Sequence, residues 1–203
     1  MTALWRAEKP LLLASRSKVR QTLLEGAGIP LEIRPADLDE RRLEADAASQ
    51  APSVVAAHLA REKARAAAKP QPGRLTLGAD QTLALGSERF PKPADMATAR
   101  VQLRKLSGRT HELHSAIAFV EDKAVLFEYV GVARLTMRAF SDEFLDLYLK
   151  AAGNAATISV GAYQLESYGI QLFERIEGDY FTILGLPLLQ ALDFLRRRGC
   201  LLQ

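Results

Sequence analysis

Cysteine is nearly absent from this chain of 203 residues, which contains only Cys200. A single thiol can form no internal disulfide and can build no cysteine-rich zinc site. Long apolar runs are also absent, because the N-terminal run 11–14 is far shorter than a signal-peptide core or a membrane span. We therefore expect a soluble protein of the reducing cytoplasm.

Strong charge is missing too. The formal net charge is +3 at pH 7, and there is no Lys/Arg tract with interleaved aromatic residues, so nucleic-acid binding is not expected. A mild positive excess is compatible with a small polyanionic ligand. The sequence lacks the patterns G-x-x-x-x-G-K-[ST], G-x-G-x-x-G, G-x-S-x-G and H-E-x-x-H. His111 and His114 lie three apart in an expected strand, so they face opposite sides and are poor co-ligands.

Apolar periodicity predicts strands and helices mixed along the whole chain. We expect strands over 10–14, 30–35, 75–85, 110–120, 124–137, 159–163 and 171–176. We expect helices over 18–27, 54–68, 95–106 and 141–151, and from about Pro187 to Arg198, with a polar stretch over 37–53. The fold class is therefore α/β or mixed α+β with a mixed sheet. The length favours one domain over residues 1–203, since domains typically have about 50 to 250 residues.

Acidic residues follow or interrupt three of the apolar segments. They are Glu40 in the Asp39-Glu40 pair, Asp80 within the run 75–85, and Glu166 after the strand-like segment 159–163. Magnesium on a phosphate substrate typically uses one or two carboxylates together with substrate oxygens. The functional interpretation is a metal-holding cluster, and the alternative is a set of turn and capping residues.

Basic and hydroxyl residues accompany these carboxylates. Ser15 and Arg20 lie at an expected strand-to-helix junction, where a helix N-terminus favours anions. Lys63 lies in the alanine-rich helix and Lys92 lies between two prolines. A lysine taken alone is most often a solvated surface residue, so only the combination suggests an anion site.

Read together, these segments resemble the Maf family of nucleotide pyrophosphatases over nearly the whole chain. The segments that carry the resemblance follow one another with the family's spacing: L-A-S-R-S-K-V-R-Q-T-L-L at 13–24, D-L-D-E at 37–40, L-A-R-E-K-A at 59–64, G-A-D at 78–80, K-P at 92–93, S-G-R-T-H at 107–111, E-R-I-E-G-D-Y-F at 174–181 and G-L-P at 185–187. Each piece is weak, and their ordered succession is specific.

The resemblance implies an elongated mixed sheet with helices in two lobes around a cleft, similar to inosine triphosphate pyrophosphatases. It also implies hydrolysis of the α–β phosphoanhydride of a nucleoside triphosphate, often by a homodimer. Two departures stand out. The family's Pro-Arg-Arg is Lys18-Val19-Arg20 here, and the Thr-Gly after the S-G-R-T-H segment is Ser115-Ala116.

Two features of the sequence bear on the identity of the base. Asp80-Gln81 and Glu166 resemble the branch that acts on 7-methyl-GTP, whereas the branch acting on dTTP and UTP usually has Asp-Thr and Gln. Gln81 either hydrogen-bonds a base edge, since an amide both donates and accepts, or merely supports Asp80.

The resulting hypothesis is a metal-assisted hydrolysis. Glu40 and Asp80, with Glu166 as an optional third ligand, would hold Mg²⁺ or Mn²⁺ against the phosphates.

In the same hypothesis, Lys63, Lys92 and Arg20 would offset oxyanion charge, and Ser15 would cradle the phosphate tail. Asp80 would act as metal ligand or would orient or deprotonate the attacking water. The alternative from another class is a nucleotide-binding regulator of division or septum formation that has lost catalysis, for which the absence of arginine at Val19 is the support.

Overall fold

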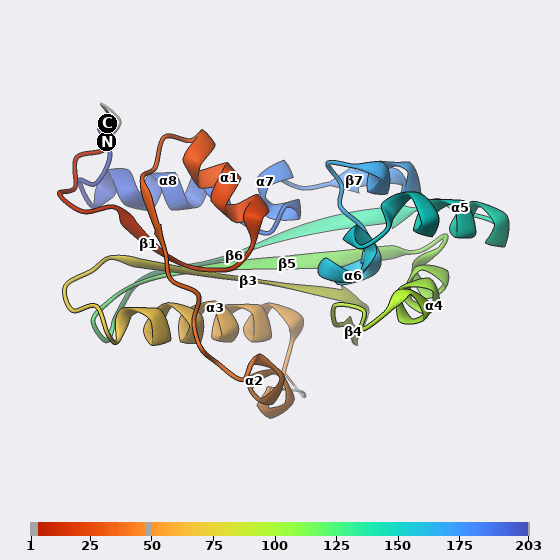
Figure 1. Ribbon diagram of the computed structural model, residues 1–203, viewed down its shortest axis with the longest axis horizontal. Helices are drawn as coiled ribbons and strands as arrows, with labels where there is room; N and C mark the ends of the chain where they lie inside the picture. Colours follow the sequence, from red (N-terminus) through yellow and green to blue (C-terminus); the bar gives the residue numbers. More distant parts are fainter. Residues whose placement is uncertain (1–3, 48–49, 203) are drawn as a thin grey trace.

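The computed structural model describes residues 4–47 and 50–202, so positions 48 and 49 of the expected polar stretch lie outside it, as do both ends of the expected domain 1–203. Its centre is a mixed seven-stranded sheet with the order β2-β1-β3-β5-β6-β7 and with β4 added beside β3 (Figure 1). The strands are β1 (Leu11–Ala14), β2 (Leu31–Ile33), β3 (Thr76–Leu85), β4 (Glu88–Phe90), β5 (Thr110–Glu121), β6 (Ala124–Met137) and β7 (Phe173–Glu177). The expected class, a mixed sheet flanked by helices, is confirmed.

One edge of β3 is shared by two partners that do not meet. β1 pairs in parallel with residues 76–78, and β4 pairs in antiparallel with residues 83–85. The opposite edge of β3 pairs with β5 from residue 76 to residue 84. The segment 79–82 is therefore bordered by a strand on one edge only, and this gap positions the site described below.

Helices cover both faces of the sheet. Figure 1 shows α3 (Pro52–Ala68) on one face and α1 (Lys18–Gly26), α7 (Tyr180–Ile183) and α8 (Leu188–Arg197) on the other. The chain ends lie at one end of the sheet, on the left in Figure 1, which we call the near end. The helices α4 (Met96–Leu106), α5 (Asp142–Ala152) and α6 (Ala155–Ile158) gather toward the opposite end, which we call the far end. The remaining elements are α2 (Glu40–Asp46) and two 3₁₀ turns, η1 (Val160–Ala162) and η2 (Tyr168–Leu172).

Two hydrophobic clusters form the main core. The near cluster joins β1, β3 and β5 to α8 through residues such as Leu13, Leu77 and Phe119. The far cluster joins β3, β5 and β6 to α4 and α5 through residues such as Leu83 and Leu113. Because apolar side chains on alternate strand positions make both clusters, the polar position between them on β3 is conspicuous, and Gln81 occupies it.

Local signals explain most helix boundaries. Ser17 and Ser141 cap α1 and α5 by accepting from the N–H groups of Arg20 and Phe144, as side-chain oxygens at N-caps do. Helix α8 ends in Arg196 and Arg197, where cations suit the helix dipole. None of the helices within residues 4–47 and 50–202 has the length and apolar character needed to cross a membrane.

The structure corrects three sequence expectations. Residues 159–163 form no strand, because Gly161 and Ala162 have φ of 75° and 62° and turn the chain into η1. The polar stretch 37–53 contains α2, capped by Asp39, whose side chain accepts from the Arg42 N–H. The short elements β4, α6 and α7 were not predicted, since none is long enough to show a period.

Candidate active site

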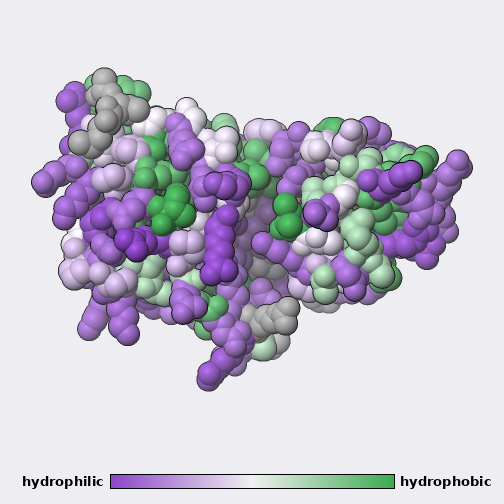
Figure 2. Space-filling view, in the orientation of Figure 1, coloured by the Kyte–Doolittle hydropathy of each residue, from purple (hydrophilic) through white to green (hydrophobic). Residues whose placement is uncertain are grey.

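A cleft of about 720 Å³ opens at the gap beside β3. Its walls come from α1, α2, α3, β3, the β4 segment, η1 and the end of α7. In Figure 2 a hollow with largely hydrophilic borders is visible near the middle of the molecule. Neighbouring residues of β3 point to opposite faces, so Asp80 faces α3 while Gln81 faces α7.

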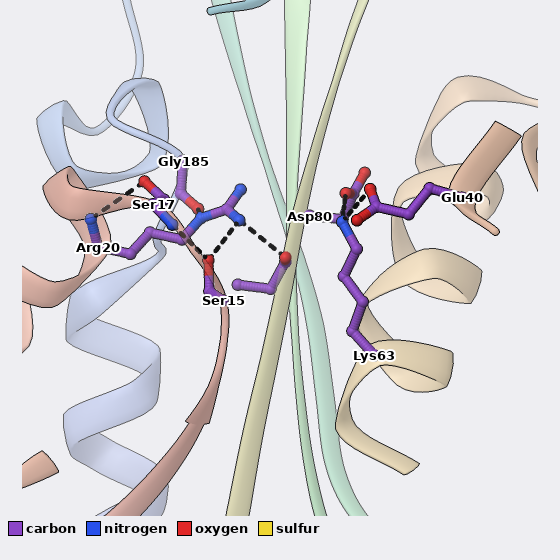
Figure 3. Close-up of polar contacts among 8 residues, drawn as sticks. Ser15, Ser17, Arg20, Glu40, Lys63, Asp80 and Gly185 are labelled. Carbon is purple, nitrogen blue, oxygen red and sulfur yellow. Dashed lines mark hydrogen bonds and ion pairs between the residues drawn. The ribbon is translucent and has the colours of Figure 1, made fainter. Parts of the chain in front are cut away.

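Lys63 links two carboxylates on the α3 side. Its Nζ lies 2.6 Å from Asp80 Oδ1 and 2.7 Å from Glu40 Oε2 (Figure 3). The Lys63 and Asp80 residues are each 8% exposed, whereas Glu40 is exposed on α2. A buried ammonium or carboxylate is costly unless it is paired, and each of these two pairs the other. The cluster therefore holds two carboxylates and one cation together at the mouth of the gap.

A third carboxylate, Glu44, lies one turn after Glu40 on α2 and also lines the cleft. Burial raises the pKa of Glu44, and the charges of Asp80 and Glu40 raise it further. Sequence reasoning missed this residue because it missed α2. The spacing of four residues between the two glutamates would have been the signal, since such residues share a helix face.

Arg20 fills the other side of β3. Its Nε donates to the Gly185 carbonyl at 2.8 Å, and its Nη1 donates to the Ala79 carbonyl at 2.8 Å and to Ser15 Oγ at 3.3 Å. Figure 3 shows this group and the Lys63 group on opposite sides of the strand. Burial lowers the pKa of Arg20, while the carboxylates of Asp80 and Glu40 raise it. Arg20 thus ties α1 to β3 and to the loop before α8, with Nη2 outside these bonds.

Lys92 completes the cationic side of the cleft from the loop after β4. The residue is exposed at the rim, yet desolvation there lowers its pKa, and the charges of Arg20 and Lys63 lower it further. Glu40 and Asp80 act in the opposite direction. The Lys92 charge therefore belongs to the same electrostatic group as Lys63 and Arg20.

Among the residues that the structure describes, positive and negative side chains in the cleft wall are equal in number. Four cations (Arg20, Lys63, Arg89 and Lys92) face four carboxylates (Glu40, Glu44, Asp80 and Glu166). A triphosphate that binds these eight side chains without a metal ion would meet no net positive charge. Within the described residues no three His, Cys, Asp or Glu side chains are arranged to hold a metal ion by themselves. Mg²⁺ is commonly bound by one or two carboxylates together with substrate oxygens. The carboxylates of Glu40 and Asp80 therefore fit a divalent cation that arrives with the nucleotide.

Gln81 is held by a network on the α7 side. Its Nε2 lies 2.9 Å from Ser115 Oγ, 2.9 Å from the Ile183 carbonyl and 3.3 Å from the Thr182 carbonyl. Ser115 Oγ in turn donates to the Thr182 carbonyl at 2.6 Å. Gln81 therefore does more than fill space beside Asp80, because α7 and β5 fix its amide group.

Another wall of the cleft comes from the segment 159–166, which carries Tyr163 and Glu166. Tyr163 Oη lies 2.8 Å from His111 Nε2, and Tyr148 Oη donates to the Ala162 carbonyl at 3.0 Å. A non-glycine residue at positive φ such as Ala162 stores strain and persists only where its surroundings hold it. The two buried contacts therefore fix the wall. His114 lies on the other face of β5 beside Glu112, as the strand spacing predicted.

Replacing His111 with glutamine is expected to make stability less sensitive to acid. Burial lowers the pKa of His111 from 6.5 to about 4. Between these pH values His111 binds a proton in the unfolded chain but not in the folded chain. The contribution of His111 to the free energy of unfolding is therefore constant above pH 6.5 and decreases as the pH falls toward 4. At about 1.4 kcal/mol per pKa unit, the loss is on the order of 3 kcal/mol.

Urea unfolding of both proteins at several pH values between 7 and 4 measures this effect. The wild-type free energy of unfolding should fall more steeply than that of His111→Gln, whatever the offset at pH 7. Equal slopes would show that His111 does not titrate in this way.

Of the eight site residues predicted from sequence, seven line the cleft: Arg20, Glu40, Lys63, Asp80, Gln81, Lys92 and Glu166. Ser15 does not line it, because it is buried and contacts Arg20. Sequence reasoning missed Glu44, Arg89 and Tyr163, which also line the cleft.

Comparisons with known proteins agree with the motifs. A family model described as "Maf-like protein" matches residues 10–198. A protein from Rhodopseudomonas palustris named "Nucleoside triphosphate pyrophosphatase" is 53% identical, with 98% of each chain covered. A protein from Rhizobium etli named "7-methyl-GTP pyrophosphatase" is 51% identical, over 93% of this chain and 96% of the other.

A solved structure titled "Structure of a HAM1 protein from Coxiella burnetii" matches with a TM-score of 0.43 and 20% identity, over 63% of this chain and 72% of the other.

Proposed function

Because this chain belongs to the Maf-like family, we propose that it hydrolyses the α–β phosphoanhydride of a nucleoside triphosphate in the cleft beside β3. The products would be a nucleoside monophosphate and pyrophosphate. The observation that carries the proposal is the Lys63 ammonium between Asp80 and Glu40. This group lies at residues 79–82 of β3, where neither β1 nor β4 borders the strand. This arrangement supplies both charge stabilisation and a carboxylate near the substrate.

Phosphoanhydride cleavage requires positioning and neutralisation of negative charge more than covalent help from the protein. Lys63, Lys92 and the Nη2 group of Arg20 would meet the phosphate oxygens from different sides of the cleft. Ser15 would act by orienting Arg20, since the two side chains are in contact and Ser15 is buried.

Asp80 would orient or deprotonate the attacking water, or would ligate the metal. A carboxylate can be a general base only if it lies within hydrogen-bond reach of the proton it takes. In the structure Lys63 holds Asp80 Oδ1, so the second oxygen, Oδ2, is the one offered to water. Glu40 and Asp80 would together hold Mg²⁺ or Mn²⁺, which would neutralise phosphate charge and polarise the anhydride.

For the base, we propose 7-methyl-GTP as the leading candidate. The support is the Asp80-Gln81 pair and Glu166, together with a 51% identical relative of that name, although other relatives bear the general name. The second candidate is a nucleotide-binding regulator without turnover. Val19, which lines the cleft where the family pattern has arginine, is the observation that favours it. The single domain over 1–203, the homodimer and the cytoplasmic location stay predictions.

Pyrophosphate release from a panel of nucleoside triphosphates, including 7-methyl-GTP, tests the function. We expect release from one or a few members with Mg²⁺ or Mn²⁺, and at least a 100-fold loss of rate with chelator, as charge-stabilising groups typically contribute about 10²–10³. Tight nucleotide binding with no release would instead favour the regulator.

A further inference from the structure

The orientation of the Gln81 amide follows from its neighbours. Two of the three atoms near Nε2 are main-chain carbonyl oxygens, of Thr182 and Ile183, and a carbonyl oxygen only accepts. With the amide reversed, its oxygen would face those two oxygens. The nitrogen end is therefore turned toward α7, and the oxygen is the end left for a ligand in the cleft that Gln81 lines.

Ser115 accepts one of the two N–H groups of Gln81 Nε2. Its hydroxyl is fully buried and lies 2.6 Å from the Thr182 carbonyl, to which it must donate its one proton. Toward Gln81 the same oxygen can then only accept, at 2.9 Å. Of the two Nε2 protons, one goes to Ser115 and the other to the Ile183 carbonyl at 2.9 Å. The chain of bonds is directional, and each bond polarises the next.

We propose that Ser115 is a positioning residue for base selection, because with the α7 carbonyls it commits both Gln81 N–H groups and leaves only the amide oxygen to read the base. This proposal rests on the proposed function. An acceptor-only Gln81 selects nucleotides whose base carries a ring N–H, as guanine, hypoxanthine, uracil and thymine do. Glu166, which also lines the cleft, is likewise an acceptor when ionised.

Adenine and cytosine carry an amino donor, but the ring nitrogen beside it accepts. That nitrogen would be set against acceptor-only groups, and an unmatched polar atom typically costs about 1–3 kcal/mol. Asp80 points to the opposite face of β3, so base selection through Gln81 and chemistry at Asp80 are separable in this site.

The experiment takes the best substrate of the pyrophosphate-release panel and its analogue methylated at the ring N–H. For wild type we expect kcat/KM to fall about 10- to 100-fold on methylation, the range that corresponds to leaving one polar group unmatched. For Ser115→Ala we expect that penalty to shrink by a factor of about 3 to 10, the worth of one hydrogen bond. On the unmodified substrate the change should appear in KM more than in kcat.

Thr136→Val is the matched control. It removes a hydroxyl from the neighbouring strand pair β5–β6, where Thr110 Oγ1 and Thr136 Oγ1 lie 2.8 Å apart outside the cleft, and it should leave the methylation penalty unchanged. An adenine or cytosine nucleotide as best substrate would overturn the proposal, and so would an equal penalty in wild type and Ser115→Ala. Absence of pyrophosphate from every nucleotide would instead overturn the proposed function itself.

Discussion

Asp80→Asn should lower kcat for pyrophosphate release by about 10²–10³, the typical effect of removing one group that stabilises charge in a transition state. The change keeps the shape of the side chain and removes its charge. Lys63 retains Glu40 as a partner at 2.7 Å, so the protein should stay folded. Stopped assays of pyrophosphate at saturating nucleotide, with the melting temperature measured in parallel, separate loss of chemistry from loss of structure.

Asp142→Asn provides the matched control for this prediction. Asp142 pairs with Arg104 at 2.7 Å at the start of α5 and does not line the cleft. An exposed ion pair is worth about 0–1 kcal/mol, so this variant should keep wild-type kcat. If Asp80→Asn retained more than a third of wild-type kcat, the assignment of Asp80 to the chemistry would fail.

The largest effect on stability is expected for Gly78→Ala. A Cβ on Gly78 would lie 2.0 Å from the Ala60 carbonyl oxygen and 2.7 Å from the Ala64 amide nitrogen. Both atoms belong to the backbone of α3, so neither can move without shifting the helix. Overpacking typically costs 1–3 kcal/mol and occasionally more, and for a backbone clash we expect about 3 kcal/mol or more. Chemical denaturation of purified protein measures the loss of unfolding free energy.

Gly26→Ala should have the opposite sign. Gly26 is the last residue of α1, its φ is not positive, and nothing lies within 4 Å of a Cβ placed there. Alanine in a helix is favoured over glycine by roughly 0.5–1 kcal/mol, so this variant should be equally or more stable. If Gly78→Ala matched wild-type stability, α3 could not pack against β3 as closely as described. Because Lys63 lies on that helix, Gly78→Ala should also reduce activity.

Strong periodic signals made much of the fold predictable. The alanine-rich segment gave α3, and alternating apolar residues gave β5 and β6 within a residue or two of the observed ends. The helix starts expected at residues 18 and 141 lie within one residue of the observed starts of α1 and α5. The strand prediction for residues 159–163 was wrong because a run of small and apolar residues resembles a strand. The positive φ values of this segment depend on contacts from distant residues such as Tyr148, which no local pattern shows.

The sequence singled out many of the charged residues that line the cleft but not their arrangement. The motifs identified Lys63, Asp80 and Glu40, yet only the sheet order places them at the uncovered stretch of β3. Glu44 depended on a seven-residue helix that leaves little periodic signal. The network around Gln81 joins β3 to carbonyls about a hundred positions later in the chain, and no local pattern encodes such a contact.

The most direct test of the proposed hydrolysis is the identity of its products. Phosphorus NMR of a nucleoside triphosphate incubated with the protein and Mg²⁺ distinguishes the two anhydride bonds. Cleavage between the α and β phosphorus atoms predicts equal amounts of nucleoside monophosphate and pyrophosphate, both lost in Asp80→Asn. Formation of nucleoside diphosphate and orthophosphate, or triphosphate that stays intact across the whole nucleotide panel, would contradict the account.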